Sequence, residues 1–224
     1  MCGKCRSGLV FYQEKEAERI MNFLVIVAFI VWLYLLSVFK RGKLDFFRYM
    51  VGSVGIFIFL MVGVQPYVTK SLVQLVTSVS GVFGRMTGVF DAYRDYSILF
   101  VENQVTGEAI SLYVDYECSG VIEMLVFLSL LAFFQVYEVW QRVIIGIIGC
   151  IVIFFSNVSR IFIICLMIKI KGNDIYYFAH TIVGRLFFYA LAILLYYYVF
   201  TYAQIKKQKV GGFSYAQPNE NSGK

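Results

Sequence analysis

The stretch VIIGIIGCIVIFFSNVSRIFIICLMI, residues 143–168, decides the fold. Arg160 is its only charged residue, and nearly all the others are apolar or small. Apolar runs of roughly 18 residues or more are typical of helices that cross a membrane. Similar runs precede and follow this one, so the sequence predicts an all-α integral membrane protein built as a polytopic helical bundle.

The overall composition leads to the same fold class. Hydrophobic residues make up 60% of the 224 residues and charged residues 15%, with a mean hydropathy of +0.74. A soluble domain has about 45–50% apolar and about 25% charged residues. The net charge of +6 does not indicate a nucleic-acid partner, because such proteins gather Lys and Arg on a soluble face. We expect the lipid bilayer as a partner and no nucleic acid.

About five helices are expected to span the bilayer. Between the second and the third, Val68–Phe90 has the pattern of an amphipathic helix lying on the outer surface. Two short apolar segments in Ser97–Asp115 predict a small extracytoplasmic β-hairpin. The expected spans run over residues 23–39, about 46–64, 120–137, 143–168 and 181–203.

The basic residues set the expected orientation, because Lys and Arg in short loops stay on the cytoplasmic side. They gather at residues 40–48, at Arg142 and at residues 206–209, whereas residues 65–117 contain six acidic and three basic residues. This distribution predicts a multi-pass plasma-membrane protein whose residues 65–117 lie outside the cell.

The two ends of the chain differ from the membrane domain, which we assign to residues 21–205. Residues 1–20 are polar and mixed in charge, and Met21 directly precedes the first apolar segment. We expect residues 1–20 to be disordered, or to lie upstream of a natural start at Met21. Residues 206–224 begin with a basic cluster and are polar, which predicts a disordered cytoplasmic tail.

Three chemically capable residues stand at or near the ends of apolar runs. They are Cys118 in Glu117-Cys118-Ser119-Gly120, Arg160 in Asn157-Val158-Ser159-Arg160, and His180, the only histidine. The span after Cys118 runs inward, and the next span returns over about 15 residues to Asn157, or roughly 22 Å. The three side chains are therefore expected on the same, extracytoplasmic side of the membrane, in one pocket.

This combination of side chains suits nucleophilic catalysis. We expect Cys118 and His180 to lie at helix N-termini, where the helix dipole favours a reactive thiolate. His180 would act as a base and then as an acid towards the leaving group. Arg160 carries a permanent charge and fixed donors, and would stabilise an oxyanion or hold a substrate carboxylate.

Four neighbouring residues are expected to support this site. Asn157 lies one helical turn before Arg160 and is expected to orient its side chain. Ser119 and Gly120 predict an N-cap and a tight entry into the helix after them. Glu117, directly before the cysteine, completes the motif.

A second pair of residues has a predicted structural role. Glu123 follows Cys118 by five residues and Arg185 follows His180 by five, on helices that run in the same direction. Lone charges inside a membrane are costly and usually paired, so we expect a buried Glu123–Arg185 ion pair. With one histidine in the chain, we expect no metal site, and no sequence motif indicates a cofactor.

A Cys-Ser-Gly that enters a transmembrane helix, an Asn-x-x-Arg about 40 residues later and a His that opens the last helix resemble the exosortase/archaeosortase family. The resemblance covers about Leu72 to Tyr198. The short chain with few spans, and the Glu before the Cys, are most similar to the Gram-positive exosortase G branch. Typical members have additional N-terminal spans that this chain lacks.

The resemblance implies a membrane-embedded cysteine protease/transpeptidase. Such an enzyme cleaves a C-terminal sorting signal of exported proteins at the outer membrane face and passes the acyl-enzyme to an acceptor. The family's catalytic triad carries over as Cys118, Arg160 and His180. In the exosortase G branch, a neighbouring glycosyltransferase is an expected partner.

Two other functions remain open at this point. In a non-enzymatic membrane subunit or small transporter, Arg160, Glu123 and Arg185 would line a polar pathway. A thiol acyltransferase acting on lipid or glycan would use the same residues on another substrate. Taken singly, each candidate also has a structural interpretation, because Cys commonly packs in cores and interfacial Arg commonly snorkels to headgroups.

Overall fold

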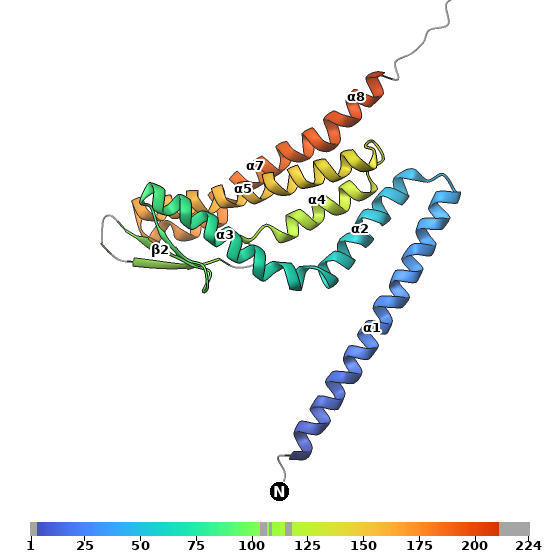
Figure 1. Ribbon diagram of the computed structural model, residues 1–224, viewed down its shortest axis with the longest axis horizontal. Coiled ribbons are helices and arrows are strands. Elements are labelled where there is room, and N and C mark those ends of the chain that lie inside the picture. Colours follow the sequence, from blue (N-terminus) through green and yellow to red (C-terminus); the bar gives the residue numbers. More distant parts are fainter. Residues whose placement is uncertain (1–3, 104–106, 108, 115–117, 211–224) are drawn as a thin grey trace, which may run out of the picture. The chain divides into compact units, whose positions relative to one another are not determined.

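The computed structural model describes the backbone of residues 4–103, 107, 109–114 and 118–210, and the side chains of residues 23–206 within these ranges except 173. The chain divides into two compact units, residues 1–58 and 59–224. Helices make up most of both units, and a small sheet belongs to the second (Figure 1). The protein is a polytopic helical membrane protein, as the sequence predicts.

The first unit contains α1 (Lys4–Arg41) and most of α2 (Asp45–Gly63). The indole of Trp32 packs on Gly55, where an added Cβ would lie 1.9 Å from Trp32 Nε1. That Nε1–H donates a hydrogen bond to the carbonyl of Val51, at 2.9 Å. The indole therefore holds α1 against α2.

Residues 4–20 are helical, which differs from the expected disorder. The segment QEKEAERIM, residues 13–21, consists mainly of strong helix formers, so the apolar helix continues upstream through it. The natural start at Met21 stays a prediction. At the other end, α8 (Ala203–Val210) includes the first residues of the tail that was expected to be disordered, so these residues are helical. Residues 211–224 lie outside the described residues.

Four described helices are long and apolar enough to cross a membrane, one fewer than expected. They are Phe23–Arg41 in α1, α2, α5 (Val139–Lys171) and the run Tyr176–Lys206. The third expected span corresponds to α4 (Val121–Phe133), whose 13 residues extend roughly 20 Å. About 30 Å of helix is needed to cross the hydrocarbon core, so four long helices and the shorter α4 correspond to the expected bundle of about five spans.

A network of side chains ends α4 early. Phe134 adopts an extended conformation, with φ −75° and ψ 111°. The guanidinium of Arg142 donates to the carbonyls of Ala132, at 3.1 Å, and Tyr137, at 3.0 Å. The hydroxyl of Tyr137 in turn donates to the carbonyl of Val199, at 2.6 Å. The helix therefore stops at Phe133 because Arg142 satisfies carbonyls that a longer helix would use.

α5 is the longest apolar helix of the second unit, with 33 residues over roughly 50 Å. Glu138 and Gln141 form a capping box at its start. Gly149 allows close packing against α4, because an added Cβ would lie 2.2 Å from the ring of Phe127. The helix is longer than the hydrocarbon core is thick, and it continues without a break through the segment after Arg160.

The last helical run begins before the expected start at Thr181. It consists of η2 (Asn173–Ile175), α6 (Tyr176–Phe178), the π-helical η3 (Ala179–Val183), α7 (Gly184–Tyr196), the π-helical η4 (Tyr197–Tyr202) and α8. A π-helical turn holds one more residue than an α-helical turn, so it rotates the next residues of the helix about its axis.

The outer stretch forms α3 (Gln65–Thr87) and a sheet. α3 corresponds to the predicted amphipathic helix, and Gly88 ends it with a left-handed φ of 64°. Strands β1 (Asp91–Tyr93), β2 (Ile98–Glu102) and β3 (Ala109–Tyr113) pair antiparallel in the order β1-β2-β3. The expected hairpin thus has a third strand, because α3 ends early enough for Asp91–Tyr93 to pair with β2.

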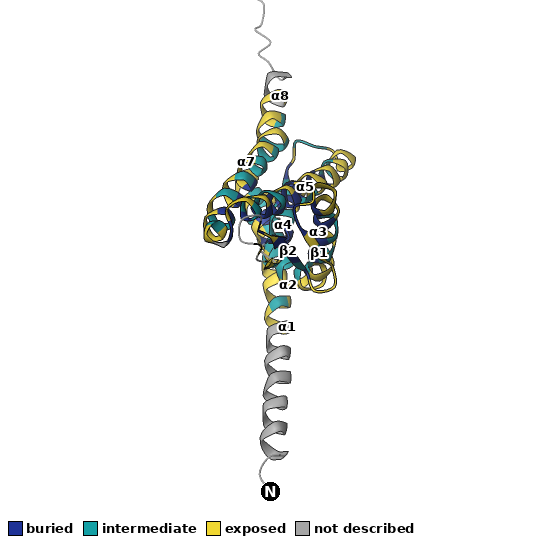
Figure 2. Ribbon diagram, turned by 90° about the vertical axis from the view of Figure 1, so that its left-hand side faces the viewer, coloured by how far each residue is buried: buried dark blue, intermediate teal, exposed yellow. Residues whose placement is uncertain are grey.

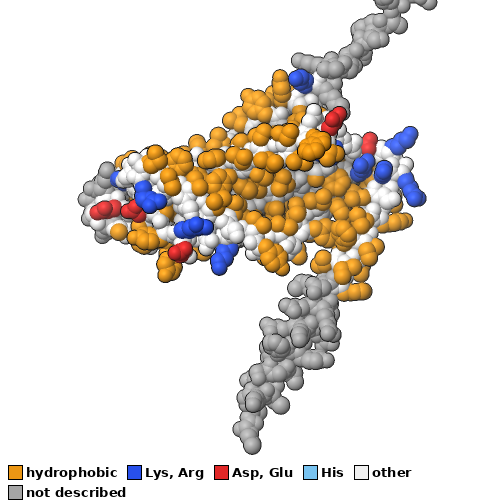
Figure 3. All heavy atoms as spheres, viewed as in Figure 1, with side chains coloured by type: hydrophobic (Ala, Val, Ile, Leu, Met, Phe, Trp, Pro, Cys, Tyr) orange, Lys and Arg blue, Asp and Glu red, His pale blue; other side chains and the backbone are white. Residues whose placement is uncertain are grey.

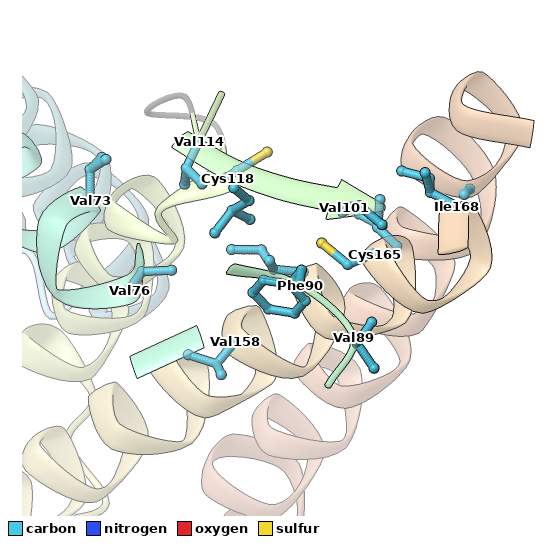
Figure 4. Packing of buried hydrophobic residues seen from close by; sticks show 14 residues of the cluster. Val73, Val76, Val89, Phe90, Val101, Val114, Cys118, Val158, Cys165 and Ile168 are labelled. Carbon is cyan, nitrogen blue, oxygen red and sulfur yellow. The ribbon is translucent and has the colours of Figure 1, made fainter. Parts of the chain in front are cut away.

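The principal core of the second unit lies where α3, α5 and the sheet meet (Figure 2). Cys118 lies at the edge of this core, close to Val114, in Figure 4. Hydrophobic side chains cover most of the helical surface seen in Figure 3, as lipid contact requires, and charged side chains gather near the sheet and also at the right of the view. The core therefore fixes the turn that carries Cys118.

Candidate active site

Cys118 lies in a tight turn directly before α4. Its side chain is 8% exposed, and Ser119 is fully buried beside it. The hydroxyl oxygen of Ser119 accepts a hydrogen bond from the backbone N–H of Val121, at 3.4 Å. Gly120 precedes α4 with φ 76°, a conformation that disfavours any other residue. Ser119 and Gly120 therefore form the expected tight entry into the helix.

Asn157 of α5 holds this turn from the side. Its Nδ2 donates to the carbonyl oxygen of Cys118 at 2.6 Å, and its side chain is 1% exposed. An added Cβ on Gly120 would lie 2.9 Å from the same Nδ2. The expectation that Asn157 orients Arg160 is wrong: the close approach at Gly120 directs its amide to Cys118, and its Oδ1 has no hydrogen-bond partner among the described residues.

His180 meets the thiol directly. Its Nε2 lies 3.4 Å from the Sγ of Cys118, and either atom can donate, depending on the tautomer of the ring. The ring of Tyr176 stacks on the imidazole, with centroids 5.7 Å apart and an interplanar angle of 29°. Tyr176 was not among the predicted site residues, although its i, i+4 spacing to the only histidine was a usable signal.

The position of His180 in its helix differs from the prediction. The expected N-terminal position is wrong, because the helical run has already started before Tyr176 and His180 lies within the π-helical η3. π-Helical turns are frequent at functional sites. The imidazole therefore reaches the thiol from inside a helix, and the helix dipole does not explain its placement.

A small cavity of about 30 Å³ lies beside the thiol and the imidazole. Its walls come from the sheet, α5 and the last helical run, and most of its lining is apolar. The lining residues are Leu99, Leu112, Tyr113, Val114, Cys118, Ile161, Ile164, Cys165, Tyr176 and His180. The reactive pair thus faces a small, mostly apolar cavity that is open on one side.

Arg160 lies one turn beyond Asn157 on α5 and is 6% exposed. Its Nε has no hydrogen-bond partner among the described residues. Its side chain is not among those that line the cavity beside Cys118 and His180. A buried guanidinium with an unsatisfied donor is costly, so this donor is available to an anionic group that enters the site.

The predicted Glu123–Arg185 ion pair does not form between these two described residues. Arg185 is exposed, whereas Glu123 is half-buried and interacts electrostatically with Arg160. The prediction assumed an unbroken α-helix from His180 to Arg185. The π-helical η3 lies between them and rotates Arg185 away from the position that an α-helix would give it.

Two further expectations concern residues around the site. Glu117 lies outside the described residues, so its place in the site stays a prediction. Within the described part of the chain, no group of three or more His, Cys, Asp or Glu side chains is placed to hold a metal ion.

The fold and the site together define a polytopic membrane protein with a partly buried thiol–imidazole pair at the junction of its helices and sheet. The chain belongs to the transmembrane exosortase family, whose model matches residues 5–197. This is a family of transmembrane peptidases and transpeptidases. No curated protein and no solved structure matches the chain.

Proposed function

We propose that the protein is a cysteine protease/transpeptidase that cleaves the C-terminal sorting signal of exported proteins. The distance of 3.4 Å between Cys118 Sγ and His180 Nε2 is the observation that carries this proposal. A nucleophile and a base within hydrogen-bond reach are the basic requirement for acyl transfer through a covalent intermediate. Membership of the exosortase family supports the same reaction class.

The proposed reaction has two stages. In the first, His180 takes the thiol proton while the sulfur of Cys118 attacks the scissile carbonyl carbon and forms a C–S bond. Collapse of the tetrahedral intermediate breaks the C–N bond, and His180 gives its proton to the departing amine. In the second stage, His180 takes a proton from an acceptor nucleophile or water, which attacks the thioester carbonyl; the C–S bond then breaks and His180 returns the proton to the sulfur of Cys118.

Two α5 residues have distinct roles in this proposal. Arg160 is the catalytic residue that stabilises the oxyanion or holds a substrate carboxylate, because its guanidinium is buried and its Nε donor is unsatisfied among the described residues. Asn157 is a positioning residue, because its amide holds the carbonyl of Cys118 and so fixes the direction of the thiol. The other supporting residues, Ser119 and Gly120, shape the turn.

The setting of the reaction is part of the proposal. We place the protein in the plasma membrane with the site on the extracytoplasmic side, because basic residues gather in the segments expected inside the cell. The Glu directly before Cys118 supports our assignment to the exosortase G branch. A neighbouring glycosyltransferase and exported proteins with a C-terminal sorting signal are its proposed partners.

Processing in cells tests this function. A cell that produces the Cys118→Ala variant should accumulate exported proteins that keep their C-terminal transmembrane segment, as measured by mass spectrometry of the membrane fraction. A Cys150→Ala variant is the matched control, since Cys150 lies on α5 and does not line the cavity. Normal processing with Cys118→Ala would refute the proposal and favour a non-enzymatic subunit or transporter.

A further inference from the structure

Strand β3 has an open edge beside the proposed active site. The backbone N–H of Val114 donates to the carbonyl of Ser97, at 2.9 Å, so these two residues form a hydrogen-bonded pair. In the antiparallel pairing that follows, Tyr113 lies opposite Ile98 and Ser111 opposite Phe100. Hydrogen-bonded pairs alternate along an antiparallel ladder. The backbone groups of Ser111 and Tyr113 therefore point away from β2, towards the outer edge of the sheet.

The two edges of the sheet differ in how they are covered. The edge strand β1 packs closely against α3, whereas β3 packs extensively only against β2 among the described elements. The side chains of Ser111 and Tyr113 are both exposed. Within the described residues, the outer edge of β3 is thus available for pairing with another extended chain.

The open edge leads directly into the cavity beside the thiol. Leu112 and Tyr113 of β3, with Val114 after them, line the cavity that also contains Cys118 and His180. A chain paired along β3 would therefore lie beside residues that line the same cavity as Cys118 and His180. A lipid tail would leave the backbone groups of Ser111 and Tyr113 unsatisfied, whereas a polypeptide supplies a donor and an acceptor at every second residue.

The cavity limits the side chain that enters beside the thiol. Leu112 from the sheet and Ile161, Ile164 and Cys165 from α5 form its apolar walls, and its volume is about 30 Å³. A volume of this size admits roughly one or two methyl-sized groups. Alanine or valine fits this description, whereas leucine and phenylalanine need more space.

We infer that the substrate is a polypeptide that binds as an extra strand along the outer edge of β3, with a small apolar residue beside Cys118. This inference rests on the proposed function and adds its substrate conformation and specificity. β3 supplies the backbone pairing that aligns the chain. Leu112, Ile161 and Ile164 select the residue whose carbonyl carbon the sulfur attacks.

The test uses peptidyl chloromethyl ketones as probes of the full-length protein in detergent. The Cys118 sulfur attacks the chloromethyl carbon, a C–S bond forms and chloride leaves, so intact mass spectrometry gives the alkylation rate. We expect pentapeptide probes ending in alanine or valine to react at least about tenfold faster than those ending in leucine or phenylalanine. The Cys118→Ala variant defines the background from other cysteines.

A second probe series tests the strand pairing in the wild-type protein. Each amide of the alanine probe is N-methylated in turn, which removes one backbone donor. In an added strand only every second N–H faces β3, so we expect alternating losses of up to about tenfold along the probe. Equal effects at all positions would overturn the inference.

A matched pair of variants tests the cavity wall. Leu112→Ala should enlarge the cavity and raise the relative rate of the leucine probe, whereas Ile110→Ala, on the same strand and equally half-buried, should not. The N-methylation series needs no variant and decides the case if Leu112→Ala does not fold. Alkylation of Cys118 without residue preference overturns this inference alone; no alkylation of Cys118 by any peptide probe overturns the proposed function as well.

Discussion

The Sγ of Cys118 lies 3.4 Å from the Nε2 of His180, although 62 residues separate them in the chain. Two local features produce this contact. The turn before α4 is held by Asn157 from α5, and the imidazole projects from the π-helical η3 with Tyr176 stacked on it. The contact thus depends on backbone geometry in both segments, which variants can test.

Gly120→Ala should disrupt the turn that carries Cys118. The substitution meets both an unfavourable φ of 76° and a Cβ contact of 2.9 Å with Asn157 Nδ2. We expect the free energy of unfolding to fall by about 2–4 kcal/mol, because a left-handed φ and a broken buried hydrogen bond each cost about 1–3 kcal/mol. We also expect alkylation of Cys118 to slow. Thermal unfolding in detergent and the alkylation rate measure these losses.

Gly88→Ala is the control for this effect. Gly88 also has a left-handed φ, 64°, but an added Cβ there would meet nothing within 4 Å. This variant should lose about 1 kcal/mol and keep the reactivity of Cys118. Equal loss of reactivity in both variants would contradict a specific role for the Gly120–Asn157 contact.

Arg160→Met should lower activity far more than stability. The guanidinium is buried and its Nε is unpartnered among the described residues, so an apolar side chain of similar length removes the cost of that buried charge, which offsets the lost attraction to Glu123. Loss of an oxyanion donor typically costs about 10²–10³ in rate. Arg85→Met removes a charge from an exposed position and should leave the rate unchanged. A clear fall in the unfolding temperature of Arg160→Met would assign Arg160 a structural role.

Gly149→Ala should separate α4 from α5. An added Cβ would lie 2.2 Å from the ring of Phe127, which is fully buried and cannot retreat easily. We expect a loss of about 1–3 kcal/mol, as overpacking of a core usually gives. Gly146→Ala, one turn earlier on α5, meets only ordinary contacts at 3.5 Å and should be neutral or gain about 0.5–1 kcal/mol. Similar unfolding temperatures of the two variants would refute the described packing.

A double-mutant cycle tests the partner of Glu123. Because Glu123 interacts with Arg160 and forms no ion pair with the described Arg185, Glu123→Gln and Arg185→Gln should be additive within about 0.5 kcal/mol. Glu123→Gln and Arg160→Met should show a larger coupling. The free energies of unfolding of the single and double variants give both values, and a strong Glu123–Arg185 coupling would restore the pairing expected from spacing alone.

Apolar runs and turn residues were enough to predict most of the fold. Runs of apolar residues define α1, α2, α5 and the last helical run, because the bilayer demands long uninterrupted helices. The early end of α4 was not predictable, since it depends on Arg142 satisfying the carbonyls of Ala132 and Tyr137. Such capping requires a tertiary arrangement that no local pattern reveals.

The candidate site shows a similar division. The rarity of His180 and the Cys118 motif predicted the contact between these two side chains, whereas Arg160, expected in the same pocket, does not line the cavity. The role of Asn157 depends on its close approach to Gly120. The stacking of Tyr176 and the separation of Glu123 from Arg185 depend on the π-helical η3. α-Helical spacing rules do not apply across a π-helical turn, so the ion-pair prediction failed there.

Capture of a thioester on Cys118 tests the central claim most directly. Cells producing a candidate sorting-signal protein with the wild-type enzyme should yield an adduct on Cys118 that neutral hydroxylamine releases, as measured by mass spectrometry. We expect no adduct with Cys118→Ala and a greatly reduced amount with His180→Ala. Processing of the substrate at the normal rate in the Cys118→Ala variant would contradict the account.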